Sequence, residues 1–142
     1  MPTGLVNALA EAAARGLVVA ETLGGDGDGF DRLLRIRVEG GGTMREIEAT
    51  LHRGPRVVRL DGVELDFDPL AHELLMRNED KPGVIGLVGS HLGAAGVNIV
   101  NFSLGATGDG GAIAAITVDR PVPEAQLASL RGIPGILSME QP

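Results

Sequence analysis

The order of the apolar runs after Ala71 constrains the fold of this chain more than any other feature. Four short runs, at residues 74–76, 97–104, 112–118 and 136–139, are typical of strands. Between them lie two stretches, 84–95 and 123–130, whose apolar residues have helical spacing. The resulting order, β-α-β-β-α-β, predicts a split ferredoxin-like α+β fold. Its two helices would cover one face of the sheet, and the other face would need a partner.

Residues 1–70 predict a different arrangement, one helix followed by an antiparallel meander. An Ala-rich stretch at 5–15 contains good helix formers, and Gly16 is placed to end it. A short strand is expected at 17–22, and alternating apolar residues predict half-buried strands at 34–38 and 45–51. Residues 57–60 and 63–65 then predict a hairpin, with Asp61-Gly62 in a type I′ turn.

The chain is therefore expected to divide into one domain at 1–70 and a second at 71–142. Its only aromatic residues are Phe30, Phe67 and Phe102, so the core must consist of Val, Ile, Leu and Ala. A unit of this size with so few large side chains has a marginal core. The first domain is therefore expected to be stabilised by packing against the second domain, a partner chain or further sequence.

Composition excludes several functional classes. The absence of cysteine excludes disulfides, thiolate metal sites and a cysteine nucleophile. The net charge of -7 disfavours nucleic acids and anionic membranes as partners, because both attract basic surfaces. No apolar run approaches the roughly 18 residues of a membrane span, and the first residues lack a secretory signal. We expect a cytoplasmic location.

Catalytic and metal-binding chemistry has little support, and no catalytic residue, metal ligand or cofactor site is expected. No serine lies in a Gly-x-Ser-x-Gly motif, and His52, His72 and His91 share no ligand spacing. Asp26 and Asp28 have the spacing of a calcium loop, but its other ligand positions are missing. Neither a G-x-G-x-x-G turn after a strand nor a P-loop is present.

The strongest candidate for a binding site is the segment Asn78-Glu79-Asp80-Lys81-Pro82-Gly83-Val84. A strand is expected to end there, and a helix to begin with Pro82 near its first position. This start leaves the amides of Gly83, Val84 and Ile85 free. Because the first turn of a helix carries partial positive charge, these amides would attract the carboxylate of an amino acid.

Polar side chains near this helix start would complete a site for a zwitterion. Lys81 adds a positive charge, Asp80 supplies a negative charge for an α-ammonium group, and Asn78 can donate or accept. Asn98, which opens the next strand, would face the Asp80 loop of a second copy if two sheets join edge to edge. The alternatives are that Asp80 only caps the helix beside a solvated Lys81, and that Asn98 is a turn residue.

Residues 78–86 and 92–99 resemble the ACT domain, the regulatory module of amino-acid metabolism. Residues 117–123 and 133–136 resemble the form found at the C-terminus of the D-3-phosphoglycerate dehydrogenase family. The upstream half resembles the second part of the intervening, allosteric-substrate-binding domain of that family, above all in Pro55-Arg56-Val57-Val58-Arg59-Leu60-Asp61-Gly62. The resemblance covers nearly the whole chain.

This resemblance implies feedback control of serine synthesis, with L-serine bound between the ACT domains of a homodimer. In that arrangement Asp80 would bind the ammonium group, the amides near Val84 the carboxylate, and Asn98 would reach across the dimer. By position, the resemblance carries effector binding to Asn78, Asp80, Lys81, Gly83, Val84, Asn98 and Ile99.

For the intervening domain the resemblance implies binding of phosphate or a phosphorylated substrate, and the nearest candidates are Arg53, Arg56 and Arg59. Acidic residues surround them, so a solvated strand face is the alternative. The resemblance implies a parent enzyme that is an NAD-dependent oxidoreductase, whose catalytic and nucleotide-binding domains are not expected in this chain. Three other functions stay open: the ACT part of an iron–sulfur L-serine dehydratase, a structural oligomerisation module without ligand, and a free-standing enzyme.

Overall fold

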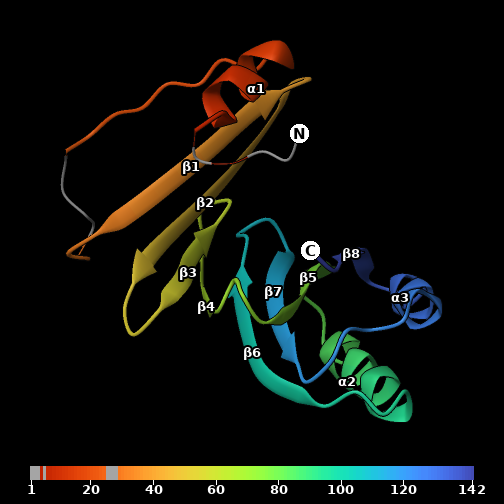
Figure 1. Ribbon diagram of the computed structural model, residues 1–142. Helices are drawn as coiled ribbons and strands as arrows, with labels where there is room; N and C mark the ends of the chain where they lie inside the picture. The colour runs from red at the N-terminus through yellow and green to blue at the C-terminus, as the bar shows by residue number, and fades with distance from the viewer. Residues whose placement is uncertain (1–3, 5, 25–28) are drawn as a thin grey trace.

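The computed structural model describes residues 4, 6–24 and 29–142, which contain two antiparallel sheets and three helices (Figure 1). Asp26 and Asp28, the pair with calcium-loop spacing, lie outside the described residues. None of the described helices is long and apolar enough to cross a membrane. The elements are, in order, α1 (Ala8–Ala14), β1 (Leu33–Gly40), β2 (Thr43–Leu51), β3 (Pro55–Leu60), β4 (Val63–Phe67), β5 (His72–Glu79), α2 (Val84–Ala94), β6 (Ile99–Ala106), β7 (Gly111–Val118), α3 (Glu124–Arg131) and β8 (Ile136–Glu140).

The second sheet confirms the ferredoxin-like prediction. Its strand order is β6-β7-β5-β8, and each neighbouring pair is antiparallel. Helices α2 and α3 lie on one face of this sheet (Figure 1), where their apolar stripes and the strands form one core. The residues of this core that are fully shielded from solvent are Leu74, Met76, Val88, Ala114 and Ile116.

The opposite face of the second sheet packs against the first sheet. Ile113 and Ala115 of β7 point away from the helices and share a second core with β3 and β4, where Val57, Leu65 and Phe67 are buried. The face that was expected to need a partner is thus covered by the chain's own hairpin. The first half of the chain therefore packs against the second through this core. A domain boundary between residues 70 and 71 stays a prediction.

Strand β4 passes very close to β6 at Gly105. A Cβ atom placed on Gly105 would overlap the side chain of Val63 and would lie 2.8 Å from the carbonyl oxygen of Glu64. Beside it, the amide of Asp66 donates a hydrogen bond to Ser103 Oγ at 2.9 Å. A residue without a side chain is therefore needed where the two sheets meet.

The first sheet is the predicted meander, with strand order β1-β2-β3-β4. The β3–β4 connection is the expected Asp61-Gly62 turn, and both residues have positive φ, 48° and 80°, as type I′ geometry requires. The Ala-rich helix is also present as α1, and Gly16 follows it with a φ of 73°.

Two expectations for the first half are wrong. Residues 17–22 form no strand, because no neighbouring segment in the described part of the chain pairs with them. The alternation in β1 predicts a half-buried strand, but Leu34, Ile36 and Val38 are 60%, 49% and 59% exposed. Register places Ile36 opposite Ile47 on the apolar face of the sheet. The second sheet covers that face only at β3 and β4.

Candidate functional site

Helix α2 begins without a side-chain cap. Its N-cap is Gly83, in the left-handed conformation with φ 94°, and the first turn contains no acidic residue. The amide of Val84 lies 3.5 Å from the carbonyl oxygen of Lys81, and the amides of Ile85 and Gly86 have no acceptor among the described residues. The partial positive charge of this helix end is therefore uncompensated by its own side chains, which favours an anionic ligand.

Helix α2 begins at Val84, as expected, and the structure decides against the alternative for Asp80. Asp80 does not cap the helix, because the chain turns at Lys81 and Pro82 before the capping position at Gly83. Pro82 accordingly precedes the N-cap and is not the first helical residue. The interpretation of Asp80 as a plain helix cap is thereby removed.

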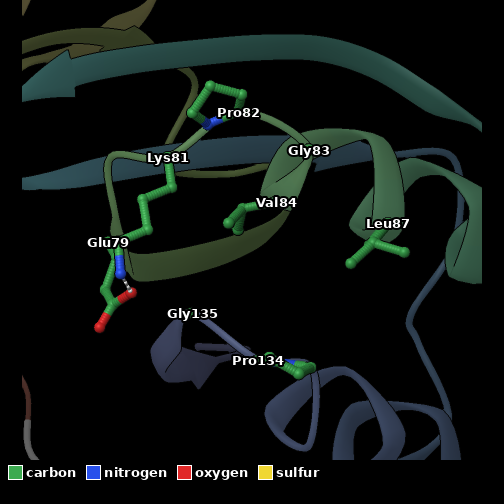
Figure 2. Close-up of a pocket in the computed structure, with 8 residues that line it drawn as sticks. All are labelled: Glu79, Lys81, Pro82, Gly83, Val84, Leu87, Pro134 and Gly135. Atoms are coloured by element: carbon green, nitrogen blue, oxygen red, sulfur yellow. Dashed lines mark ion pairs between the residues drawn. The ribbon is translucent and has the colours of Figure 1, made fainter.

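The start of α2 opens into a hollow of about 540 Å³. Its walls are mainly aliphatic, and its charged side chains are Glu79 and Lys81 (Figure 2). Gly135 lies so close to the helix that a Cβ on it would be 2.9 Å from Val84 Cγ2. The lining comes from the end of β5, the start of α2 and the α3–β8 loop: Glu79, Lys81, Pro82, Gly83, Val84, Leu87, Pro134 and Gly135.

The two charged side chains of the hollow form an ion pair. Lys81 Nζ lies 2.6 Å from Glu79 Oε2, and the side chains are 67% and 42% exposed. Figure 2 shows this pair at one end of the hollow and Leu87 at the other. Asp80 is exposed and does not line the hollow, and its amide donates to the carbonyl oxygen of Gly110 at 2.9 Å.

The expected effector set thus lacks five residues of the hollow: Glu79, Pro82, Leu87, Pro134 and Gly135. Pro134 and Gly135 lie far along the chain and reach the site because β8 pairs with β5, a relationship with no local signal. Leu87 was detectable, because it follows Val84 by one helical turn. Glu79 had no such signal, because the alternation of side chains along a strand does not say which of two neighbouring acids faces a site.

Asn78 of β5 is buried, with 2% exposure. Its Nδ2 donates to the carbonyl oxygen of Glu79 at 2.8 Å, and its Oδ1 has no hydrogen-bond partner among the described residues. A buried acceptor without a donor is costly. The side chain of Asn78 therefore fixes the backbone of Glu79 through Nδ2, while its Oδ1 stays without a donor among the described residues.

The two remaining effector candidates lie at the other end of the sheet. Ile99 is the first residue of β6 and pairs with Val118, whereas Glu79 pairs with Gly111 at the opposite end of β7. The amide of Asn98 donates to Asp119 at 3.0 Å, and its side chain is exposed. Within one copy of the chain, the structure therefore does not bring Asn98 and Ile99 to the hollow.

The three arginines expected to bind phosphate do not present free guanidinium groups together. Arg56 Nη2 lies 2.7 Å from Asp66 Oδ1. Arg59 Nη1 lies 2.6 Å from Glu48 Oε2, a carboxylate that Arg35 also contacts. Arg53 lies in the β2–β3 turn with a positive φ of 54°. These carboxylates compete with phosphate, and phosphate binding stays a prediction.

Away from the hollow, one buried acid lies on the face of β5 that meets the first sheet. Glu73 is 4% exposed, accepts a hydrogen bond from Thr117 Oγ1 at 2.5 Å, and has a second oxygen without a described partner. Burial raises the pKa of the Glu73 carboxyl, and the bond from Thr117 opposes it. The three histidines are exposed, and no group of acids and histidines among the described residues could hold a metal.

The second half of the chain thus has the βαββαβ order, with a hollow at the start of its first helix. Residues 72–137 match the ACT domain family, and they form an ACT domain.

The chain as a whole is similar to proteins named D-3-phosphoglycerate dehydrogenase. It is 32% identical to the protein of Bacillus subtilis (strain 168), over 95% of this chain and 26% of that protein. For the protein of Archaeoglobus fulgidus the identity is 30%, over 94% of this chain and 26% of that one. For the Synechocystis sp. protein it is 34%, over 92% and 24%. The chain spans about a quarter of the length of these curated relatives.

Proposed function

We propose that this chain is the regulatory, amino-acid-binding portion of a D-3-phosphoglycerate dehydrogenase of serine biosynthesis, with L-serine as its effector. The observation that carries the proposal is the uncapped start of α2, which opens into a hollow with a carboxylate and an ammonium group at its edge. An α-amino acid carries the two complementary charges. The name of the relatives supports serine over other amino acids.

The ligand set proposed from the sequence includes residues from both ends of the sheet, and a dimer would join them. In the described part of the chain, no strand pairs with the outer edge of β6. The end of β6 lies beside the start of β7, since Ala106 pairs with Ala112, and β7 there meets the end of β5. Antiparallel pairing of β6 with its copy would bring the partner's Asn98 and Ile99 to the end that carries Asp80 and Lys81.

In this proposal the effector acts by joining two ACT domains and changing the angle between them. An attached catalytic portion would sense that angle, and coupling of this kind typically amounts to about 1–3 kcal/mol. Oxidation of phosphoglycerate and binding of NAD would belong to the rest of the enzyme, since this chain contains no glycine-rich nucleotide-binding turn. We place the protein in the cytoplasm with that pathway.

Calorimetry with L-serine, glycine and L-valine tests the proposal on protein whose dimeric state is established by analytical ultracentrifugation. We expect saturable heat with serine. Asn98→Ala should weaken serine binding at least about tenfold while the dimer persists, because in this proposal its exposed side chain reaches the ligand of the partner subunit. Glu124→Gln, at the exposed start of α3, is the matched control and should bind as the unmodified chain does.

Absence of heat with all three amino acids at millimolar concentration, on a confirmed dimer, would contradict the ligand proposal. That result would favour a structural oligomerisation module. The ACT part of an iron–sulfur L-serine dehydratase is the other alternative, and the similarity to dehydrogenases over most of the chain weighs against it.

A further inference from the structure

We infer that Asp119 and Arg120, directly after β7, position Asn98 for the effector that a partner subunit binds. Asp119 is a positioning residue: it acts through Asn98 and does not itself touch the ligand. The inference rests on the proposed function, because it concerns how the site between two ACT domains is completed from the β6 edge. Neither the sequence pattern nor the family resemblance gives Asp119 or Arg120 a role in binding.

Two hydrogen bonds join Asn98 to Asp119 at the start of β6. The amide of Asp119 donates to the carbonyl oxygen of Asn98 at 3.0 Å, and the amide of Asn98 donates to Asp119 Oδ1, also at 3.0 Å. The neighbouring residues, Ile99 and Val118, are the first pair of the β6–β7 ladder. In a regular antiparallel pair both bonds link backbone groups. Here a carboxylate replaces the backbone acceptor, so the placement of the Asn98 backbone depends on the side chain at position 119.

The chain on either side of Asn98 explains why this bond matters. The β6–β7 register shifts between Ile99 and Asn101, so the ladder is interrupted directly after Ile99. Before Asn98, Val97 is buried in the core, and its amide donates to a carbonyl oxygen of the last turn of α2 at 2.9 Å. Asp119 therefore holds the one residue that lies between a fixed point in the core and an irregular strand.

Arg120 fixes the carboxylate of Asp119 in turn. Its Nε lies 3.2 Å from Asp119 Oδ1 and its Nη2 lies 2.9 Å from Oδ2, which is a contact at two points. The hydrogen bonds from Arg120 and from the amide of Asn98 hold the pKa of the Asp119 carboxyl below its usual range. The acceptor of the Asn98 amide is therefore charged at neutral pH.

This arrangement leaves the side chain of Asn98 to a ligand. Both bonds to Asp119 use the backbone of Asn98, and the side chain of Asn98 is exposed beside the edge strand β6. A group on a backbone that is already ordered loses less freedom when a ligand binds, and this favours affinity. Loss of the Asp119 carboxylate should therefore weaken the effector through Asn98.

The test is a double-mutant cycle on L-serine affinity, measured by calorimetry on the full chain as a confirmed dimer. Asp119→Ala removes the acceptor of the Asn98 amide, and we expect serine to bind at least about fivefold more weakly. In a chain that already carries Asn98→Ala, the same change should alter affinity less than about twofold, because the side chain that Asp119 positions is gone. Asp119→Asn keeps an oxygen acceptor and should bind serine within about threefold of the unmodified chain.

Glu124→Ala is the matched control for the loss of an exposed ion pair. Glu124 Oε1 lies 2.6 Å from Arg131 Nη1, and both residues belong to α3. Like Asp119→Ala, this change removes a carboxylate from an exposed arginine, but it leaves the start of β6 untouched. Serine affinity should stay as in the unmodified chain.

Three results would overturn the inference and leave the proposed function intact, provided that Asn98→Ala alone loses affinity. One is an equal loss from Asp119→Ala with and without the Asn98 side chain. The second is unchanged serine affinity in Asp119→Ala. The third is loss of the dimer in that variant, which would make Asp119 a structural residue. If the unmodified chain binds no serine, the proposed function fails and the inference falls with it, before any variant is measured.

Discussion

Arg77 of β5 forms an ion pair with Asp61, at the tip of the β3–β4 hairpin, and thereby joins the two sheets. Asp61 Oδ2 also lies 2.9 Å from Arg45 Nε, and its Oδ1 accepts a hydrogen bond from the amide of Glu46 at 2.8 Å. The side chains of Arg77 and Asp61 are 31% and 16% exposed, so water screens this pair less than a surface pair. The Arg77–Asp61 ion pair therefore connects the first sheet to β5, the strand that ends at the hollow.

Removing this link should loosen the contact between the sheets. Arg77→Gln is expected to lower the free energy of unfolding by about 1–2 kcal/mol, because Asp61 then loses a partly buried charged partner. Urea denaturation measures the change. Arg45→Gln is the matched control: Arg45 contacts the same oxygen but is 52% exposed, and its loss should cost less than about 0.5 kcal/mol. Equal losses would mean that the sheets are not joined through Arg77.

Gly105→Ala should create a steric clash where β4 packs against β6. Its Cβ would lie 2.8 Å from a backbone oxygen that cannot rotate away, so we expect a loss of about 1–3 kcal/mol in the free energy of unfolding. The control is Gly86→Ala on the exposed side of α2, where a Cβ meets nothing within 4 Å. Since alanine favours helix, this change should stabilise the protein by about 0.5–1 kcal/mol. Thermal denaturation of both variants checks the opposite signs.

Glu73 should make stability depend on pH. Its folded-state pKa lies above the unfolded value of 4.5, so its favourable contribution is present below 4.5 and is lost as the pH rises through the folded pKa. Glu73→Gln keeps an acceptor for Thr117 and removes the buried charge. At neutral pH we expect it to stabilise the chain by on the order of 1 kcal/mol.

Denaturation of Glu73→Gln and the unmodified chain at pH 7 and pH 4 measures this difference. The stabilisation should shrink at the lower pH, where both side chains are uncharged. A gain of the same size at both pH values would contradict the assignment to the buried charge.

The second sheet covers the first sheet at β3 and β4 but not at β1. Shortening an apolar side chain should therefore lower the free energy of unfolding more in β3 or β4 than in β1. Ile36→Ala, on the exposed part of the apolar face, should cost less than about 1 kcal/mol. Leu65→Ala, on the same sheet but in the core shared with β7, should cost about 2–4 kcal/mol. Chemical denaturation of the two variants compares them directly. Similar costs would show that β1 is covered in solution.

Much of the fold could be predicted from local patterns. The order of strands and helices after Ala71, the Asp61-Gly62 turn and the helix start near Gly83 all depend on residues a few positions apart. The false strand at 17–22 shows the limit of the same reasoning. Its residues suit a strand, yet a strand exists only where another pairs with it.

The candidate site could likewise be predicted only in part. By itself the sequence determined that a positive helix start would follow a strand with acidic and basic residues beside it, because capping and charge pattern are local properties. Only the tertiary structure decided that Glu79 faces the hollow and Asp80 does not, that Pro134 and Gly135 form its far wall, and that β3 and β4 cover the open face of the second sheet. These outcomes depend on which surfaces meet, and contacts between distant segments leave no periodic trace along the chain.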